Sequence, residues 1–326
     1  MITIGSKKIE TNIFLAPLAG CTDLSFRLIA REHGARFCFF EMIDANSLIY
    51  MRRKNLEILK THKDDAPIGA QLLGSDPAVM LAAAQKLLTL IDPLFLDINA
   101  ACPAKKVIRK KAGSCLLQDP ARLCEIIKKL ASALPLPITV KLRIGYDKKD
   151  PKAIAEIAQR CEDSGASAIF VHGRTKSQGY SGDIDYDSIK AIKNEIKVPL
   201  FGIGNILTPD LAKVMLDRTG CDGIMVARGS LGNPWIFKDI ESYLKDGIEP
   251  AQKNHAMMVK TLKKHLSYIE RYKNNSIVNK MGEMRKAALW YLKGFPSAAR
   301  VRDRICRTKG YSELIEAIDT LFVPTQ

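Results

Sequence analysis

The sequence predicts an α/β fold: a (β/α)8 barrel of the TIM type followed by a small all-helical C-terminal domain. Between residue 13 and about residue 244, eight short apolar runs alternate with longer amphipathic segments. The size and the count fit eight strands that are each followed by a helix. The apolar runs are continuous rather than alternating, as expected for parallel strands that are buried on both faces.

Each expected element has its own signal in the chain. The helices between the strands show helical periodicity, and several begin with a capping residue followed by proline, as at Asp119-Pro120 and Thr208-Pro209. The expected strands are Ile13–Ala16, Phe37–Glu41, Ile68–Leu72, Leu94–Ile98, Ile138–Leu142, Ala168–His172, Leu200–Ile203 and Gly223–Ala227. The clearest expected helices are Pro77–Leu90, Ala121–Leu134, Lys152–Asp163, Tyr186–Ile196 and Pro209–Asp217.

A doubly wound open sheet is the structural alternative, and polar residues favour the barrel. Six of them stand at or just beyond the C-terminal ends of their strands: Glu41, Gln71, Asn99, Lys141, His172 and Asn205. In a barrel these positions converge on one mouth, where active sites lie. An open sheet would spread them along a crevice.

Composition excludes several classes of protein. The chain has 326 residues, of which 47% are hydrophobic and 26% charged, so it is neither disordered nor fibrous. Its eight cysteines form no C-x-x-C pair, and its five histidines form no cluster with them, so we expect no metal site. The first twenty residues do not resemble a signal peptide, and no apolar run is long enough to span a membrane. We therefore expect a reduced, cytoplasmic protein without a membrane partner.

The chain changes character after residue 244, which predicts domains at 1–244 and 245–326. The second part has no β-rich run and predicts helices over about 252–272, 277–293, 297–308 and 311–321. It carries 16 Lys and Arg against 8 Asp and Glu, so it holds +8 of the chain's net +15. A solvated helical face would explain such charge, and so would a polyanionic partner.

Cys102 stands in the stretch with the most chemical information. Residues 97–107 read DINAACPAKKV, which starts on an expected strand and continues into a lysine-rich loop. A cysteine there could be a nucleophile, a general acid or a packed thiol. Its companions are Asn99 and lysines rather than a histidine base, and this fits no hydrolase pattern.

A series of motifs resembles the tRNA-dihydrouridine synthases, most closely the bacterial B-type branch. The motifs are APLAGCTD at 16–23, QLLGS at 71–75, DIN with Cys102-Pro103, TVKLR at 139–143, HGRT at 172–175 and ARGSLGNPW at 227–235. They follow one another in the family's order along the whole expected barrel. The resemblance implies an enzyme that uses FMN, with NADPH as the electron donor, to reduce the C5–C6 double bond of uracil in tRNA. We expect it to act as a monomer; the sequence specifies neither the uridine position nor a preference for NADPH over NADH.

The residues expected to bind FMN follow from the resemblance and from its chemistry. The phosphate needs backbone N–H donors, which the glycine-rich turns at 202–205 and 227–229 supply, and Arg228 can pair with it. The ring needs donors and positive charge, for which Lys141 and Gln71 are the candidates. The full expected set is Ala16, Pro17, Leu18, Gln71, Lys141, His172, Ile203, Gly204, Asn205, Ala227 and Arg228.

The resemblance assigns Cys102 the role of proton donor to uracil C5. Asn99 is expected to hold the substrate or the flavin ring. His172 and Arg174 are expected to contact the flavin phosphate or to orient the base. In the basic tail, Arg285, Lys286, Lys293 and Arg300 are expected to track tRNA phosphates.

Three positions depart from the family's pattern. Ala101 replaces a glycine before the Cys-Pro pair, Ile203 an asparagine and Asn205 an aspartate. The methyl group of Ala101 matters only where φ is positive, and Ile203 removes one side-chain donor, so the affinity for FMN stays open. Two alternative functions also stay open. One is an FMN barrel acting on a free pyrimidine, as in dihydroorotate dehydrogenase, and the other is a non-catalytic RNA-binding protein.

Overall fold

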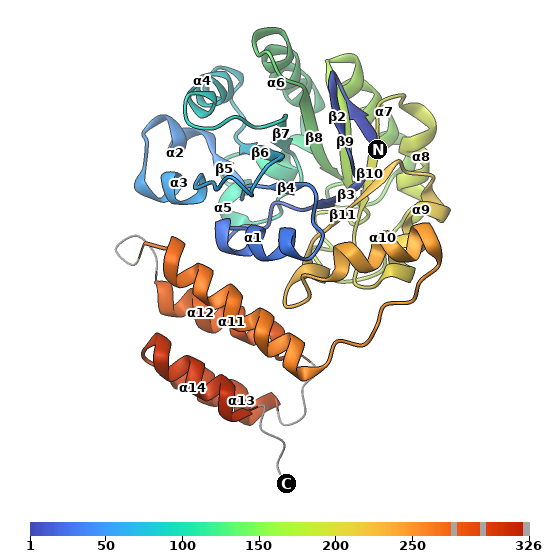
Figure 1. Ribbon diagram of the computed structural model, residues 1–326. Helices are drawn as coiled ribbons and strands as arrows, with labels where there is room; N and C mark the ends of the chain where they lie inside the picture. Colours follow the sequence, from blue (N-terminus) through green and yellow to red (C-terminus); the bar gives the residue numbers. More distant parts are fainter. Residues whose placement is uncertain (275–278, 294–297, 322–326) are drawn as a thin grey trace.

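The computed structural model describes residues 1–274, 279–293 and 298–321, and it shows the expected barrel (Figure 1). All eight expected strands form: β3 (Ile13–Leu15), β4 (Cys38–Phe39), β6 (Ile68–Leu73), β7 (Leu96–Asn99), β8 (Ile138–Arg143), β9 (Ala166–His172), β10 (Leu200–Ile203) and β11 (Gly223–Val226). They pair in parallel in the order β3-β11-β10-β9-β8-β7-β6-β4. A parallel bridge between Phe14 and Phe37 joins the two ends, so the sheet closes.

Helices surround this barrel and cover its outer face. They are α1 (Leu24–Glu32), α4 (Pro77–Leu88), α6 (Pro120–Ala133), α7 (Pro151–Asp163), α8 (Tyr186–Glu195), α9 (Pro209–Thr219) and α10 (Ile236–Asp246). Asp76, Asp119 and Asp150 cap their helices, each directly before a proline. Thr208 precedes Pro209 as expected, but its side chain makes no capping hydrogen bond.

Several short elements were not expected from the sequence. The hairpin of β1 (Ile2–Ile4) and β2 (Lys7–Ile9) precedes the barrel. Short segments also follow some strands on the mouth side: β5 (Ile43–Asp44), α2 (Ala45–Ile49), α3 (Arg53–Ile58), α5 (Lys105–Ile108), η1 (Gly113–Gln118) and η2 (Arg228–Ser230). They lack periodicity because each is too short to show one.

The barrel interior has an aromatic half and a polar half. Six buried phenylalanines and the hairpin's Ile4 and Ile9 share one core cluster: Phe14, Phe37, Phe39, Phe95, Phe170 and Phe201. Phe37 and Phe95 stack with ring centroids 5.1 Å apart. On β7 to β9, polar side chains follow on the same inward face toward the C-terminal ends, because side chains alternate along a strand. Apolar side chains therefore fill the barrel at the N-terminal ends of the strands, and the polar side chains lie at the C-terminal ends.

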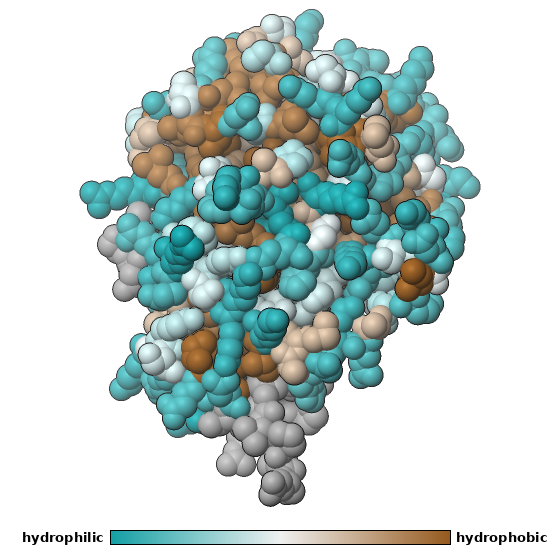
Figure 2. All heavy atoms as spheres, viewed as in Figure 1, coloured by the Kyte–Doolittle hydropathy of each residue, from teal (hydrophilic) through white to brown (hydrophobic). Residues whose placement is uncertain are grey.

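The basic tail folds into α11 (His255–Tyr272), α12 (Lys280–Tyr291), α13 (Ala298–Arg307) and α14 (Tyr311–Leu321), as expected. These helices have a separate core that includes Leu266, Met284 and Ile318. The expected boundary at residue 244 falls in the last turn of α10, which ends at Gly247 in the left-handed conformation. The tail contacts the barrel through Phe26 of α1, whose ring lies 5.7 Å from His265 and from Trp290. Hydrophilic side chains cover much of the face viewed in Figure 2.

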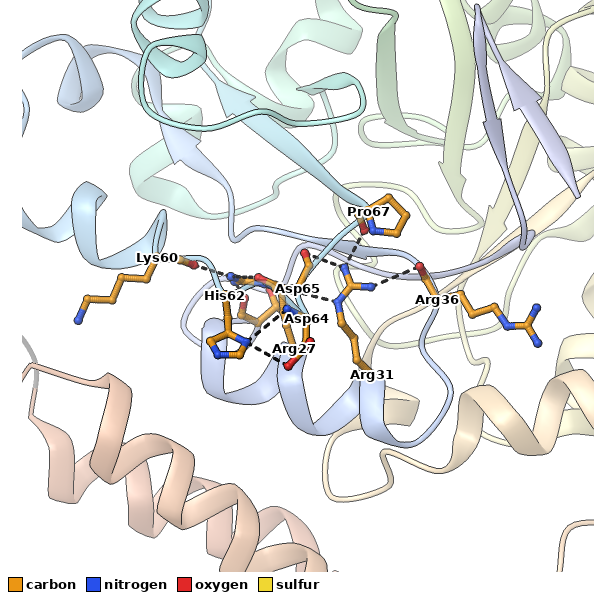
Figure 3. A network of polar contacts seen from close by, with 9 residues as sticks. Arg27, Arg31, Arg36, Lys60, His62, Asp64, Asp65 and Pro67 are labelled. Carbon is orange, nitrogen blue, oxygen red and sulfur yellow. Dashed lines mark hydrogen bonds and ion pairs between the residues drawn. The ribbon is translucent and has the colours of Figure 1, made fainter.

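A buried ion network fixes α1 against the segment that leads into β6 (Figure 3). Asp65 accepts from Arg27 at 2.7 Å and from Arg31 at 3.1 Å, and the side chains of Arg27 and Asp65 are fully buried. Arg27 also donates to the carbonyl of Thr22 at 2.8 Å. The network therefore anchors the loop that connects β3 to α1. Removing one partner of such a pair typically costs about 3–5 kcal/mol.

Within the described residues, no helix is both long and apolar enough to cross a membrane. The same part of the chain contains no group of three or more His, Cys, Asp or Glu residues placed to hold a metal ion.

Candidate active site

A cavity of about 460 Å³ opens at the C-terminal mouth of the barrel. Its lining includes thirteen of the residues expected to act on cofactor or substrate: Ala16, Pro17, Leu18, Gln71, Asn99, Cys102, Lys141, His172, Ile203, Gly204, Asn205, Ala227 and Arg228. These residues come from seven of the eight strands or the loops after them. The fold thus brings together side chains that lie more than 200 residues apart in the sequence.

A chain of hydrogen bonds runs across the floor of this cavity. Asp97 accepts from the hydroxyl of Thr139 and from Nε2 of Gln71, each at 2.7 Å. The Oε1 atom of Gln71 accepts in turn from Nδ2 of Asn99, also at 2.7 Å. Since an amide has one accepting and one donating end, this order fixes the orientation of both amides. Burial raises the pKa of Asp97 to about 7, against the effect of these two hydrogen bonds and of Lys141.

The same chain ends on the loop that carries Cys102. The Oδ1 atom of Asn99 accepts the backbone N–H of Ala101 at 3.1 Å and that of Cys102 at 2.9 Å. From the other side, Nε of Arg143 donates to the carbonyl of Ala101 at 2.7 Å. The carbonyl of Cys102 accepts from the backbone and the hydroxyl of Ser114. The loop is therefore held on both sides, and the half-buried thiol lines the cavity.

Positive charge gathers around His172, which lines the cavity from the end of β9, two strands away from β7 and the Cys102 loop. Burial and, next, the charges of Lys141, Arg143, Arg174 and Arg228 lower the pKa of His172 to about 2. Burial, followed by the charge of Arg143, lowers the pKa of Lys141 to about 8. A neutral imidazole among four cationic side chains is an electrostatic arrangement that favours an anion.

Gly204 and Gly229 stand where neighbouring atoms leave no space for a side chain. A Cβ atom at Gly204 would lie 2.3 Å from Ile184, and one at Gly229 would lie 2.0 Å from the carbonyl of Ile206. Gly229 belongs to η2, whose first N–H groups have no acceptor within the turn itself. Arg228 beside it is exposed and makes no ion pair within the described chain. Backbone N–H donors and a guanidinium that makes no ion pair are groups that can bind a phosphate.

The three departures from the family pattern are accommodated in the fold. Ala101 is not among the described residues with positive φ, so its methyl group causes no backbone strain. Asn205 has φ +49°, and asparagine tolerates that left-handed conformation better than most residues. Ile203 is buried in the aromatic cluster of the barrel interior, where it packs rather than donates.

Arg174 stands behind the cavity wall. Its guanidinium donates to Oδ1 of Asn205 at 3.0 Å and to the carbonyl of Gly182. It therefore orders the 203–206 turn from behind.

Among the expected residues of the tail, Arg285, Lys286 and Lys293 lie outside the cavity lining. Lys286 donates to the carbonyl of Gly20 and pairs with Glu283, so it joins α12 to the loop after β3. The Nε atom of Arg285 is buried and has no hydrogen-bond partner among the described residues. Lys293 is exposed. Arg300 belongs to α13, but its side chain lies outside the described residues.

Three residues of the site were not singled out from the sequence. Asp97 and Arg143 each stand two residues from an expected site residue on the same strand, so the two-residue period of a strand was an available signal. Tyr180 lines the cavity from the loop after β9, with its ring 5.1 Å from the guanidinium carbon of Arg228. No pattern marks that loop residue.

Known proteins resemble this chain over most of its length. The family model described as dihydrouridine synthase matches residues 14–323. The tRNA-dihydrouridine synthase B of Vibrio parahaemolyticus is 36% identical over 98% of both chains. The protein of that name from Pasteurella multocida is 39% identical over 89% of this chain and 86% of its own.

Solved structures share the fold at low identity. The old yellow enzyme from Trypanosoma cruzi superimposes with a TM-score of 0.58 at 9% identity, over 79% of this chain and 94% of that chain. An amine oxidase from Pseudomonas geniculata N1, which acts on 6-hydroxypseudooxynicotine, gives a TM-score of 0.59 at 14% identity, over 81% of this chain and 52% of that chain.

Proposed function

Because the chain belongs to the dihydrouridine synthase family, and is thus a flavin-dependent oxidoreductase, we propose that it reduces the C5–C6 double bond of uridines in tRNA with FMN and NADPH. One observation carries the proposal. Cys102, on a loop that hydrogen bonds fix in place, lines the same cavity as His172 and the cationic side chains around it. That arrangement combines a proton donor with a site for an anionic cofactor.

The residues of the cavity fit FMN. The backbone donors near Gly204 and Gly229, with Arg228, would hold its phosphate, and the close approach at both glycines leaves no room for a side chain. Lys141 and Gln71 would face the ring, and Ala16–Leu18 would pack along it. Once reduced by NADPH, bound FMN would supply the hydride that uracil receives at C6.

Cys102 would complete the reduction by giving its proton to C5. The bond between sulfur and hydrogen breaks as the bond between C5 and hydrogen forms, so a thiolate remains. Lys141 and Arg143 interact electrostatically with Cys102, and solvent would return a proton to the sulfur afterwards. Asn99 would orient the base, and its contact with the Cys102 backbone would set the thiol's position relative to C5.

A macromolecular substrate explains the basic tail. The target base has to leave its stack in order to reach the barrel mouth, which favours a loop nucleotide. Arg285 on α12 and exposed Lys293 would supply positive charge for tRNA phosphates. The free-pyrimidine alternative does not explain the basic helical tail. The non-catalytic alternative does not explain why hydrogen bonds fix the Cys102 loop at the cavity.

The purified protein tests the proposal directly. We expect bound FMN, a flavin absorbance band that bleaches under NADPH without tRNA, and dihydrouridine after unmodified tRNA is added. The Cys102→Ala variant should keep its flavin and still bleach, yet form dihydrouridine about 10²–10⁴-fold more slowly. Wild-type protein that binds no FMN would overturn the cofactor assignment. A Cys102→Ala variant with wild-type turnover would overturn the assignment of the proton donor. Turnover of free uracil or orotate in place of tRNA would support the free-pyrimidine alternative.

A further inference from the structure

A second cavity, of about 630 Å³, lies beside the catalytic one. The two share Ala19, Met42 and Lys106 in their linings, so they adjoin. The second cavity is bounded by the α2–α3 segment, by α5 and by the tail residues Lys273 and Glu283. It therefore lies in the seam between the barrel mouth and the helical domain, on the way out from Cys102.

The barrel side of this seam is strongly basic. Two short segments, 52–54 and 105–111, contain eight exposed cationic residues: Arg52, Arg53, Lys54, Lys105, Lys106, Arg109, Lys110 and Lys111. Arg52, Lys54, Lys106 and Lys110 line the cavity itself. Of these four, Lys110 pairs with Asp44 at 2.7 Å, whereas the other three have no ion pair within the described chain.

The carboxylates of the cavity already have partners. Asp23 pairs with Lys273 at 2.6 Å, Glu57 with Lys60 at 2.8 Å, and Glu283 with Lys286. Glu41 accepts the backbone N–H of Gly20. Arg52, Lys54 and Lys106 have no ion pair within the described chain, against one such carboxylate, Glu41, so the remaining charge of the cavity is positive.

An exposed aromatic ring stands among these cations. Tyr50 lines the cavity with 75% of its surface exposed, directly after α2. The next residue, Met51, has φ +49°, an unfavourable conformation for a methionine. Strained backbone of this kind is concentrated at functional sites. Cations around an exposed ring are the combination that binds single-stranded nucleic acid.

We propose that this second cavity binds the unpaired tRNA nucleotides next to the target uridine. A neighbouring base would stack on Tyr50, and its phosphates would contact Arg52, Lys54 and Lys106. The barrel and the helical domain would thus contact the RNA from its two sides. The inference rests on the proposed function, since it assigns a further part of the same substrate.

Binding of an unmodified tRNA transcript at several salt concentrations tests the charges. The Arg52→Ala/Lys54→Ala variant should lower the slope of log K against log salt by about 0.7–0.9 for each lost phosphate contact. The matched control is Lys128→Ala/Lys129→Ala, which removes two exposed charges from α6, on the far side of the barrel from the helical domain (Figure 1). The control should keep the wild-type slope. A wild-type slope in the first variant, or an equal fall in both, would overturn the proposal.

Tyr50 provides an independent test of stacking. Tyr50→Ala should weaken tRNA binding about 5- to 100-fold, whereas Tyr50→Phe keeps the ring and should bind like the wild type. Equal affinities for all three proteins, or equal losses in both variants, would contradict the stacking role. Flavin content and NADPH-driven bleaching should be normal in every variant, because none of the substituted residues lines the catalytic cavity. Failure of the wild-type protein itself to modify tRNA would instead count against the proposed function.

Discussion

The side-chain oxygen of Asn99 accepts the backbone N–H of Cys102 at 2.9 Å, so a strand residue fixes the start of the loop that carries the thiol. The orientation of Asn99 is determined by Gln71, and that of Gln71 by Asp97. The position of the thiol thus depends on a carboxylate at the floor of the barrel.

Asn99→Ala should separate proton donation from cofactor chemistry. Without the acceptor, the Cys102 loop loses its inner support, and a displacement near 1 Å typically costs about 10²-fold in rate. We expect dihydrouridine formation to fall by about that factor while NADPH still bleaches the flavin at its usual rate. Single-turnover kinetics measures flavin reduction by NADPH and dihydrouridine formation separately. An unchanged rate of dihydrouridine formation would show that Asn99 does not position the Cys102 loop.

Asp97→Asn should act at a distance through the same chain. If the new amide group faces Gln71, then Gln71 and Asn99 must both turn over, and Asn99 would present its NH₂ to the Cys102 amide. We expect a loss of kcat for tRNA similar to that of Asn99→Ala. The double variant should lose little more than either single one, because coupled residues are not additive. Thr139→Ser keeps the hydroxyl donor to Asp97 and is the matched control; additive losses would exclude the relay.

Lys141→Ala should weaken the hold on the flavin. The side chain lies among the residues that would face the ring, and its charge also lowers the pKa of His172. We expect a lower flavin content after purification or slower bleaching by NADPH. An unchanged content together with an unchanged rate would place Lys141 outside the cofactor site.

His265 should make the protein sensitive to acid. It is buried between α1 and α12, and burial lowers its pKa from 6.5 to about 4. A lowered pKa in the folded state means that stability is complete above pH 6.5 and falls as the unfolded chain takes up the proton. Between pH 7.5 and pH 5.0 the free energy of unfolding should fall by about 2 kcal/mol from this residue. Urea unfolding of His265→Gln should show a pH dependence smaller by that amount; an identical dependence would contradict the assignment.

Charge removal from the helical domain should affect tRNA binding alone. Arg285→Ala or Lys293→Ala should each lower the salt slope by about 0.7–0.9 if the side chain contacts a phosphate. Lys190→Ala removes an exposed charge from α8 and is the matched control. Wild-type slopes in both tail variants would remove the RNA-binding role from these residues.

The sequence predicts the barrel well because its evidence is local and repeated. Each strand is a buried apolar run, and caps such as Asp119-Pro120 mark helix starts by their own chemistry. The convergence of Gln71, Lys141 and His172 follows from the closed topology once the strands are known. Short elements such as α2 and α5 have too few residues to show a period.

The rest of the site depends on contacts that a pattern does not contain. The role of Asp97 follows from which atoms of Gln71 and Asn99 face one another. Lys286 looks like any exposed lysine in the sequence, yet it binds the carbonyl of Gly20 across the domain boundary. The basic segment 105–111 is visible in the sequence, but its place beside Arg52 and Tyr50 appears only in the fold.

Position-resolved mass spectrometry of tRNA from a strain without this gene tests the central claim most directly. The account predicts that dihydrouridine disappears from one or more specific positions. Wild-type protein should restore it there, and the Cys102→Ala variant should not. An unchanged dihydrouridine content in the deletion strain, or full restoration by Cys102→Ala, would contradict the account.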